Sequence, residues 1–104
     1  MARRGEGIIE RYSERTAQQF GGLARKIAYP GRRGATDRLL LLPGGVIAFF
    51  ELKHDDEPLN ALQEKEHKIL RDLGFCVATV RDEIGFRELC TDAIAWRKNP
   101  PPYW

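Results

Sequence analysis

The chain has 104 residues, of which 42% are hydrophobic and 31% charged, and its formal net charge at pH 7 is +2. This length supports one domain with one core and excludes a second domain of similar size. No apolar run approaches the roughly 18 residues of a membrane-spanning helix, and no apolar stretch follows the basic start as in a signal peptide. We therefore expect an intracellular protein without a membrane partner.

The first part of the chain is predicted to form a helix and a short strand. Apolar residues recur at helical spacing over residues 6–20, and the Gly-Gly pair at 21–22 ends the pattern. Residues 23–29 are predicted as a short strand that ends at a Pro-Gly pair. A loop over residues 32–34 follows.

A β-hairpin comes next. Residues 39–42 form one apolar run, and residues 46–53 form the longest and most apolar predicted strand. The Pro-Gly-Gly sequence at 43–45 is a strong turn signal, so the two strands should pair antiparallel.

The rest of the chain alternates helix and strand. Residues 55–58 are predicted to open a second helix that stops at Gly74, followed by a strand over 75–80 and a third helix over 84–98. A strand, a helical crossover and another strand indicate parallel pairing. We therefore predict an α/β fold, a mixed central sheet flanked by helices on both faces. The expected boundaries are residues 1–98 for a single domain and 99–104 for a Pro-rich aromatic tail.

Two cysteines, Cys76 and Cys90, stand alone inside apolar segments and lack the Cys-X-X-Cys spacing of many metal and redox sites. A free cysteine packs in a core much as a small apolar residue does. We therefore predict buried, reduced thiols without a zinc or redox role.

The hairpin carries the most informative polar residues. Asp37 precedes its first strand, and Glu51 and Lys53 project to the same side near the end of the second, because strand side chains alternate between faces. Two carboxylates and an ammonium in this arrangement can hold a hard divalent cation and activate a water, which is nuclease chemistry. Alternatively, Asp37 caps a turn and Lys53 is only an ion-pair partner of Glu51.

Other polar residues occur in pairs or clusters with two interpretations each. Glu6 and Glu10 lie one helical turn apart, either as solvated residues favoured at a helix start or as a further metal ligand. Gln63 and His67 are also one turn apart, and His67 is either a packed residue or part of a site. Zinc is not expected, since no second His or Cys lies at ligand spacing. Basic residues near the hairpin form either a solvated loop or a phosphate-contacting rim, and they are Arg25, Lys26, Arg32, Arg33 and Arg38.

Taken in order, several of these features resemble one known family. From about Glu6 to Leu89 the chain is similar to a stand-alone VRR-NUC domain (virus-type replication-repair nuclease) of the PD-(D/E)XK superfamily. The family's usual Pro-Asp pair is replaced here by Thr36-Asp37, which changes a residue that shapes the backbone and binds no metal. The matching features are an acidic helix start, Gly21-Gly22, residues 31–34, Asp37-Arg38-Leu39, the Pro-Gly-Gly turn, Glu51-Leu52-Lys53, Gln63 with His67, and Gly74 before a strand that ends at Val80-Arg81.

The resemblance implies a restriction-endonuclease-like core and a metal site. One or two Mg²⁺ or Mn²⁺ ions would be held by Asp37, Glu51 and the backbone carbonyl of Leu52. Glu6 would complete the site, with Glu10 as the fallback acid. The ions would serve hydrolysis of a phosphodiester by in-line attack of water.

The remaining roles also follow from the resemblance. Lys53 would orient or deprotonate the attacking water and stabilise charge in the transition state. Gln63 would orient a phosphate or a water. The residues expected to contact DNA are Arg32, Arg33, Arg38 and His67.

The function implied is that of a structure-specific endodeoxyribonuclease. A short chain without an appended reading domain should recognise the shape of branched DNA through phosphates. A homodimer that cuts four-way (Holliday) junctions is expected, in the cytoplasm of a bacterial cell or phage-infected host, within DNA repair or recombination. The alternatives are a flap or single-strand nuclease, and a non-cleaving DNA-binding protein that retains the fold.

Overall fold

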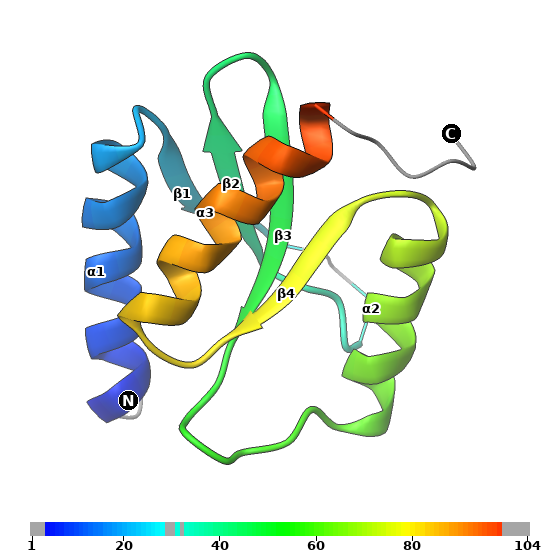
Figure 1. Ribbon diagram of the computed structural model, residues 1–104. Helices are drawn as coiled ribbons and strands as arrows, with labels where there is room; N and C mark the ends of the chain where they lie inside the picture. The colour runs from blue at the N-terminus through cyan, green and yellow to red at the C-terminus, as the bar shows by residue number, and fades with distance from the viewer. Residues whose placement is uncertain (1–3, 29–30, 32, 99–104) are drawn as a thin grey trace.

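The computed structural model describes residues 4–28, 31 and 33–98, and side chains from residue 10 to residue 96 within these ranges. The predicted tail, residues 99–104, lies outside the described residues. No helix in the described part is long and apolar enough to cross a membrane. In chain order the elements are α1 (Arg4–Gln19), β1 (Leu23–Lys26), β2 (Arg38–Leu42), β3 (Val46–Leu52), α2 (Ala61–Asp72), β4 (Cys76–Val80) and α3 (Glu83–Lys98) (Figure 1).

The strands form one mixed sheet in the order β1-β2-β3-β4. The pairs β1–β2 and β2–β3 are antiparallel, and β3–β4 is parallel because α2 returns the chain to the starting edge of the sheet. The tight β2–β3 turn uses Gly44 at φ +83° and Gly45 at φ +76°, which glycine adopts at little cost. The predicted mixed sheet is confirmed.

Helices cover both faces of the sheet, as predicted (Figure 1). The Phe50 ring of β3 lies 5.3 Å from the Phe86 ring of α3, whereas the adjacent Glu51 lies against His67 of α2. Because strand side chains alternate, every second residue of β3 enters the core shared with α1 and α3. That core holds Ala17, Leu40, Leu42, Val46, Ala48, Phe50, Leu52, Cys76, Val80, Phe86, Leu89, Cys90 and Ala93.

The second helix starts later than predicted. The sequence predicts its opening at residues 55–58, but α2 begins at Ala61. Asn60 is the N-cap: its side chain accepts from the Gln63 N–H at 2.9 Å, and its own N–H donates to Gln63 Oε1 at 3.0 Å. This reciprocal capping box fixes the start after Pro58, because the residue before a proline disfavours helical geometry.

The first predicted strand is shorter than expected. Residues 23–29 are predicted as strand, but β1 ends at Lys26. Only Leu23 to Lys26 have partners on β2, in register with Leu41 to Arg38. Beyond this point the Ile27 N–H still donates to the carbonyl of Asp37 at 2.7 Å, but residues 27 and 28 are not part of a strand.

Candidate functional site

Polar residues meet where β2 begins and β3 and β4 end. This edge of the sheet is formed by the ends of the strands and not by an outer strand. Glu51 is the register partner of Thr79 on β4. On the other side Arg38 pairs with Phe50, and continuing this register by one residue places Asp37 opposite Glu51. The carbonyl of Asp37 accepts from the Ile27 N–H at 2.7 Å, which extends the ladder to that residue. The sheet therefore brings both predicted carboxylates to the same edge, and Asp37 Oδ1 lies 3.9 Å from Nε of Arg38.

Glu51 is largely buried against α2. Its side chain is 13% exposed, and Oε1 lies 3.8 Å from Nε2 of His67. His67 is fully buried, and Glu51 Oε1 and both ring nitrogens of His67 have no hydrogen-bond partner among the described residues. A buried carboxylate oxygen without a donor is costly, so the position fits a cation or an ordered water as the missing partner.

Lys53 also lies beside this edge. The sequence suggested Glu51 as its ion-pair partner, but in the structure the partner is Glu57. It is 8% exposed, and its Nζ lies 3.5 Å from Oε2 of Glu57. Leu52, which lies between Glu51 and Lys53 in the sequence, points into the core on the opposite face. At Leu52, therefore, the backbone carbonyl and not the side chain is the group available to a metal.

Glu10 and Arg38 form an ion pair on the other face of the sheet. Arg38 Nη1 lies 3.2 Å from Glu10 Oε1, and Nη2 donates to Oε2 at 3.3 Å. The hydrogen bond from Arg38 holds the pKa of Glu10 below its ordinary value. Arg38 shares the face of its partner Phe50, so the structure does not bring Glu10 together with Glu51.

The other predicted residues are placed as follows. Gln63 uses its side-chain oxygen in the capping box, which leaves its amide N–H groups for a phosphate or water. Arg33 is exposed, whereas the buried imidazole of His67 presents no surface to DNA. Arg32 and the side chain of Glu6 lie outside the described residues. Among the described side chains, no three His, Cys, Asp or Glu residues are grouped to hold a metal ion.

Sequence reasoning missed two residues near this edge. Glu57 belongs to an acidic run predicted as the opening of α2, but its carboxylate turns back to Lys53. Arg81, directly after β4, donates to backbone carbonyls of residues 54, 55 and 57. A Lys and a Glu four residues apart were a visible signal for the first contact, whereas nothing local indicated the second.

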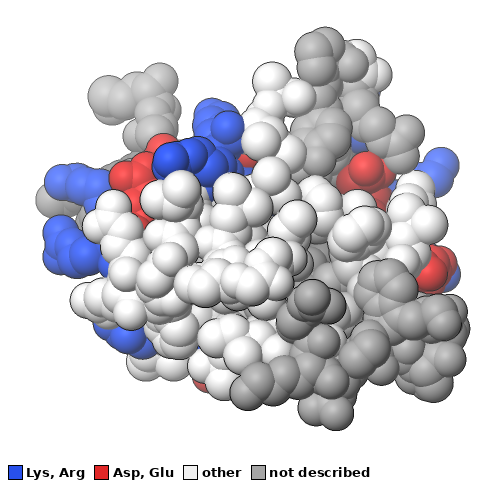
Figure 2. Space-filling model, turned by 90° about the horizontal axis from the view of Figure 1, so that it is seen from above, with Lys and Arg blue, Asp and Glu red and all other residues white. Residues whose placement is uncertain are grey.

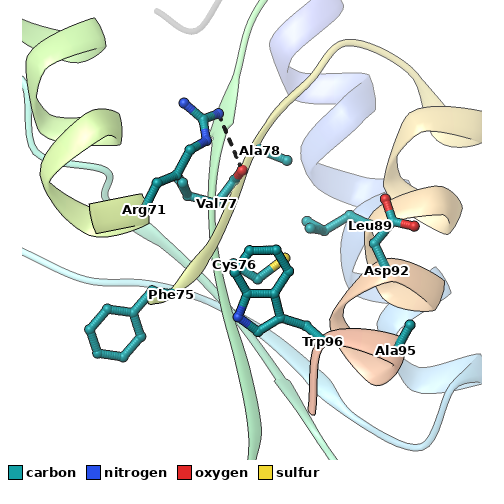
Figure 3. A pocket seen from close by; sticks show the side chains of 9 residues that line it. All are labelled: Arg71, Phe75, Cys76, Val77, Ala78, Leu89, Asp92, Ala95 and Trp96. Atoms are coloured by element: carbon teal, nitrogen blue, oxygen red, sulfur yellow. Dashed lines mark hydrogen bonds between the residues drawn. The ribbon is translucent and has the colours of Figure 1, made fainter. Parts of the chain in front are cut away.

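A surface pocket of about 520 Å³ lies elsewhere, along β4 between α2 and α3 (Figure 3). Its walls are mainly apolar, and Arg71 at its rim donates to the carbonyl of Val77 at 3.4 Å. None of the predicted site residues lines it. The lining residues are Arg71, Phe75, Cys76, Val77, Ala78, Leu89, Asp92, Ala95 and Trp96.

The end of the sheet that carries the β2–β3 turn has a different surface. Seen from that end, the described residues form a broad area without charged side chains, and Lys and Arg gather toward the side of α1 (Figure 2). Leu23 and Ile47, both register partners of Leu41, are 41% and 47% exposed. Exposed apolar side chains in a row are more typical of protein contact than of DNA contact.

Comparison with known proteins identifies relatives. No family model matches the chain. The chain is 42% identical over 69 residues to "Putative nuclease p44" of Acyrthosiphon pisum secondary endosymbiont phage 1, a match that covers 66% of this chain and 74% of that protein. A solved structure described as a VRR_NUC domain superposes with a TM-score of 0.71 at 31% identity, covering 91% of this chain and 96% of that one. The fold predicted from sequence is therefore shared along nearly the whole of both chains.

Proposed function

Because the chain belongs to the VRR-NUC family, we propose that it is a metal-dependent endodeoxyribonuclease that hydrolyses phosphodiester bonds in branched DNA. The observation that carries this proposal is the edge shared by Asp37 and Glu51, where a buried oxygen of Glu51 has no hydrogen-bond partner in the described part of the chain. A carboxylate pair of this kind is the ligand type that Mg²⁺ and Mn²⁺ prefer.

Asp37, Glu51 and the carbonyl of Leu52 would hold the ion, with Glu6 as the further acid. When bound, the ion supplies an activated water and neutralises charge on the phosphate. Mg²⁺ keeps several of its own waters, so a sparse set of protein ligands is sufficient. The buried oxygen of Glu51 then gains the partner that it lacks among the protein atoms.

Lys53 supplies a positive donor beside the carboxylates. In the reaction a water oxygen bonds to phosphorus and the bond from phosphorus to the 3′ oxygen breaks, which leaves a 5′-phosphate and a 3′-hydroxyl. The proton of the water passes to the surrounding solvent or to a neighbouring base. A donor held in place before the reaction stabilises the charge that develops on the phosphate, and Lys53 is held in place by Glu57.

Contacts to the DNA backbone would come from exposed basic residues near the same edge. Arg25, Lys26 and Arg33 are exposed, and Lys26 is the register partner of Arg38 at the start of β2. Phosphate contacts position a duplex without reading bases, which suits recognition of DNA shape. Arg38 contributes less directly, because its guanidinium is engaged by Glu10.

A four-way junction is the substrate that we propose first, cut by a homodimer. A two-fold dimer presents two sites to two symmetric strands. The row Leu23–Leu41–Ile47 supports a protein contact, since it is apolar, partly exposed and remote from the carboxylates.

The test uses labelled four-way junction, flap and linear duplex with Mg²⁺, Mn²⁺ or EDTA. Glu51→Gln removes the proposed ligand, and Glu88→Gln on the exposed side of α3 is the matched control. Paired symmetric nicks in the junction, lost with EDTA and in Glu51→Gln but not in the control, are expected. If the protein instead prefers to cut flaps or single strands, the proposed substrate is wrong and the nuclease activity stands. If the protein binds DNA without cleaving it, the proposed enzyme activity is wrong and the chain is a DNA-binding protein of the same fold.

A further inference from the structure

Arg81 and Lys53 leave the sheet side by side, at the ends of its two parallel strands. Leu52 and Val80 are register partners, and the N–H of Lys53 donates to the carbonyl of Val80 at 3.1 Å. Lys53 and Arg81 are the next residues of their strands. The side chain that follows β4 therefore starts within reach of the loop that follows β3.

The Arg81 side chain holds that loop through the loop's backbone carbonyls. Its Nη1 donates to the carbonyl oxygens of His54 at 2.7 Å, Glu57 at 2.6 Å and Asp55 at 3.3 Å. The segment has no helix or strand of its own, and the turn that it forms adds a hydrogen bond from the Glu57 N–H to the His54 carbonyl at 3.2 Å. A charged donor makes stronger hydrogen bonds than a neutral one. The guanidinium of Arg81 thus adds to the loop's own hydrogen bonds and fixes the loop in a closed shape.

The closed loop returns the Glu57 side chain to Lys53. Glu57 Oε1 accepts from the His54 N–H at 3.4 Å, and Oε2 lies 3.5 Å from Lys53 Nζ. Both side chains are partly buried, at 28% and 11% exposure. The carboxylate thereby links the backbone of the loop to the ammonium.

We propose that Arg81 is a positioning residue for Lys53, acting through the closed loop and the Glu57 carboxylate. The catalytic consequence rests on the proposed function. Asp37 and Glu51 are held by the ladders of the sheet and not by this loop. Loss of Arg81 should therefore displace the ammonium and leave the metal ligands in place.

The first experiment needs no catalysis. Hydrogen exchange of amides in residues 54–60 and the rate of acetylation of Lys53 are measured by mass spectrometry in the whole chain. Arg81→Ala is expected to raise both rates about 10- to 100-fold, the range for loss of a charge-assisted hydrogen bond. Arg81→Lys should restore part of the protection, because lysine keeps the charge and three donors.

Two further variants separate the steps of the argument. Glu57→Gln should expose Lys53 to acetylation while amide exchange in the loop stays near wild type. Arg87→Ala removes an equal charge from α3, where Arg87 contacts Gln19 and Glu83, and should change neither rate. Unchanged exchange and acetylation in Arg81→Ala would overturn the proposal.

The second experiment measures single-turnover cleavage and, by calorimetry, Mn²⁺ affinity. Arg81→Ala is expected to slow cleavage about 10- to 100-fold with unchanged Mn²⁺ affinity, and Arg81→Lys to recover part of the rate. Loss of Mn²⁺ binding, or full cleavage with an exposed Lys53, would overturn the positioning role. A wild-type chain that does not cleave would refute the proposed function instead, and exchange and acetylation would still decide whether Arg81 positions Lys53.

Discussion

Replacing Glu51 by glutamine should stabilise the metal-free protein. The side chain is 13% exposed, and its buried Oε1 has no hydrogen-bond partner. An unsatisfied buried polar atom costs about 1–3 kcal/mol, and a charged one costs more. Glutamine keeps the shape, removes the charge and offers an amide N–H to the His67 nitrogen that lies 3.8 Å from Oε1. We expect a gain of about 1–2 kcal/mol in the free energy of unfolding, or about 4–16 °C in Tm for a domain of this size.

The assay is thermal and urea unfolding in EDTA, with Glu88→Gln as the exposed control. Mg²⁺ should then stabilise the wild-type protein, by about 2.7 kcal/mol at a hundred times its Kd, and leave Glu51→Gln nearly unaffected. If Glu51→Gln is no more stable than wild type in EDTA, the reasoning about the buried oxygen is refuted. Equal stabilisation of both proteins by Mg²⁺ would show that the ion binds elsewhere.

Three further outcomes are expected. Asn60→Ala should lose about 1 kcal/mol of stability and about 4–8 °C in Tm because the capping box is removed, whereas Asn60→Asp should keep most of it; equal losses in both variants would contradict this. Arg38 lowers the pKa of Glu10 from its ordinary value of 4.5, so their ion pair contributes stability above that pH and loses it as pH falls through the lowered pKa. At 41% exposure, the advantage over Glu10→Gln should be a few tenths of a kcal/mol at pH 7, and in urea titrations it should be lost as the pH falls through the lowered pKa. Burial raises the pKa of Cys90 to about 11, so its thiol should react with Ellman's reagent at pH 8 only at the rate of unfolding; a fast reaction in the native protein would contradict its burial.

The arrangement at the sheet edge was largely predictable from sequence. Alternation along residues 46–53 and the turn before them were enough to expect Asp37 and Glu51 on one side, because hairpin register is set by local rules. The start of α2 was also predictable from the sequence, since Asn60 and Gln63 have capping-box spacing. It was missed because the acidic residues before Pro58 also suit a helix start.

Contacts between distant segments were not predictable. Glu10 and Arg38 are 28 residues apart, and their pairing depends on how α1 packs on the sheet. Helical spacing placed Glu10 on a face of α1 but did not say which residue that face meets. The same limit applies to Arg81, whose partners lie more than 20 residues earlier.

The parallel pairing of β3 with β4 has a consequence for the order in which the protein matures. The hairpin that bears Asp37 and Glu51 closes through contacts near in sequence, whereas β4 docks only after the chain through Val80 is available and a crossover is closed. During synthesis the two carboxylates can therefore come together well before Arg81 reaches its loop. A ribosome-bound or partly folded chain would have Asp37 and Glu51 in place while Lys53 is still mobile. All three side chains would be in position only after β4 has docked and Arg81 has bound its loop.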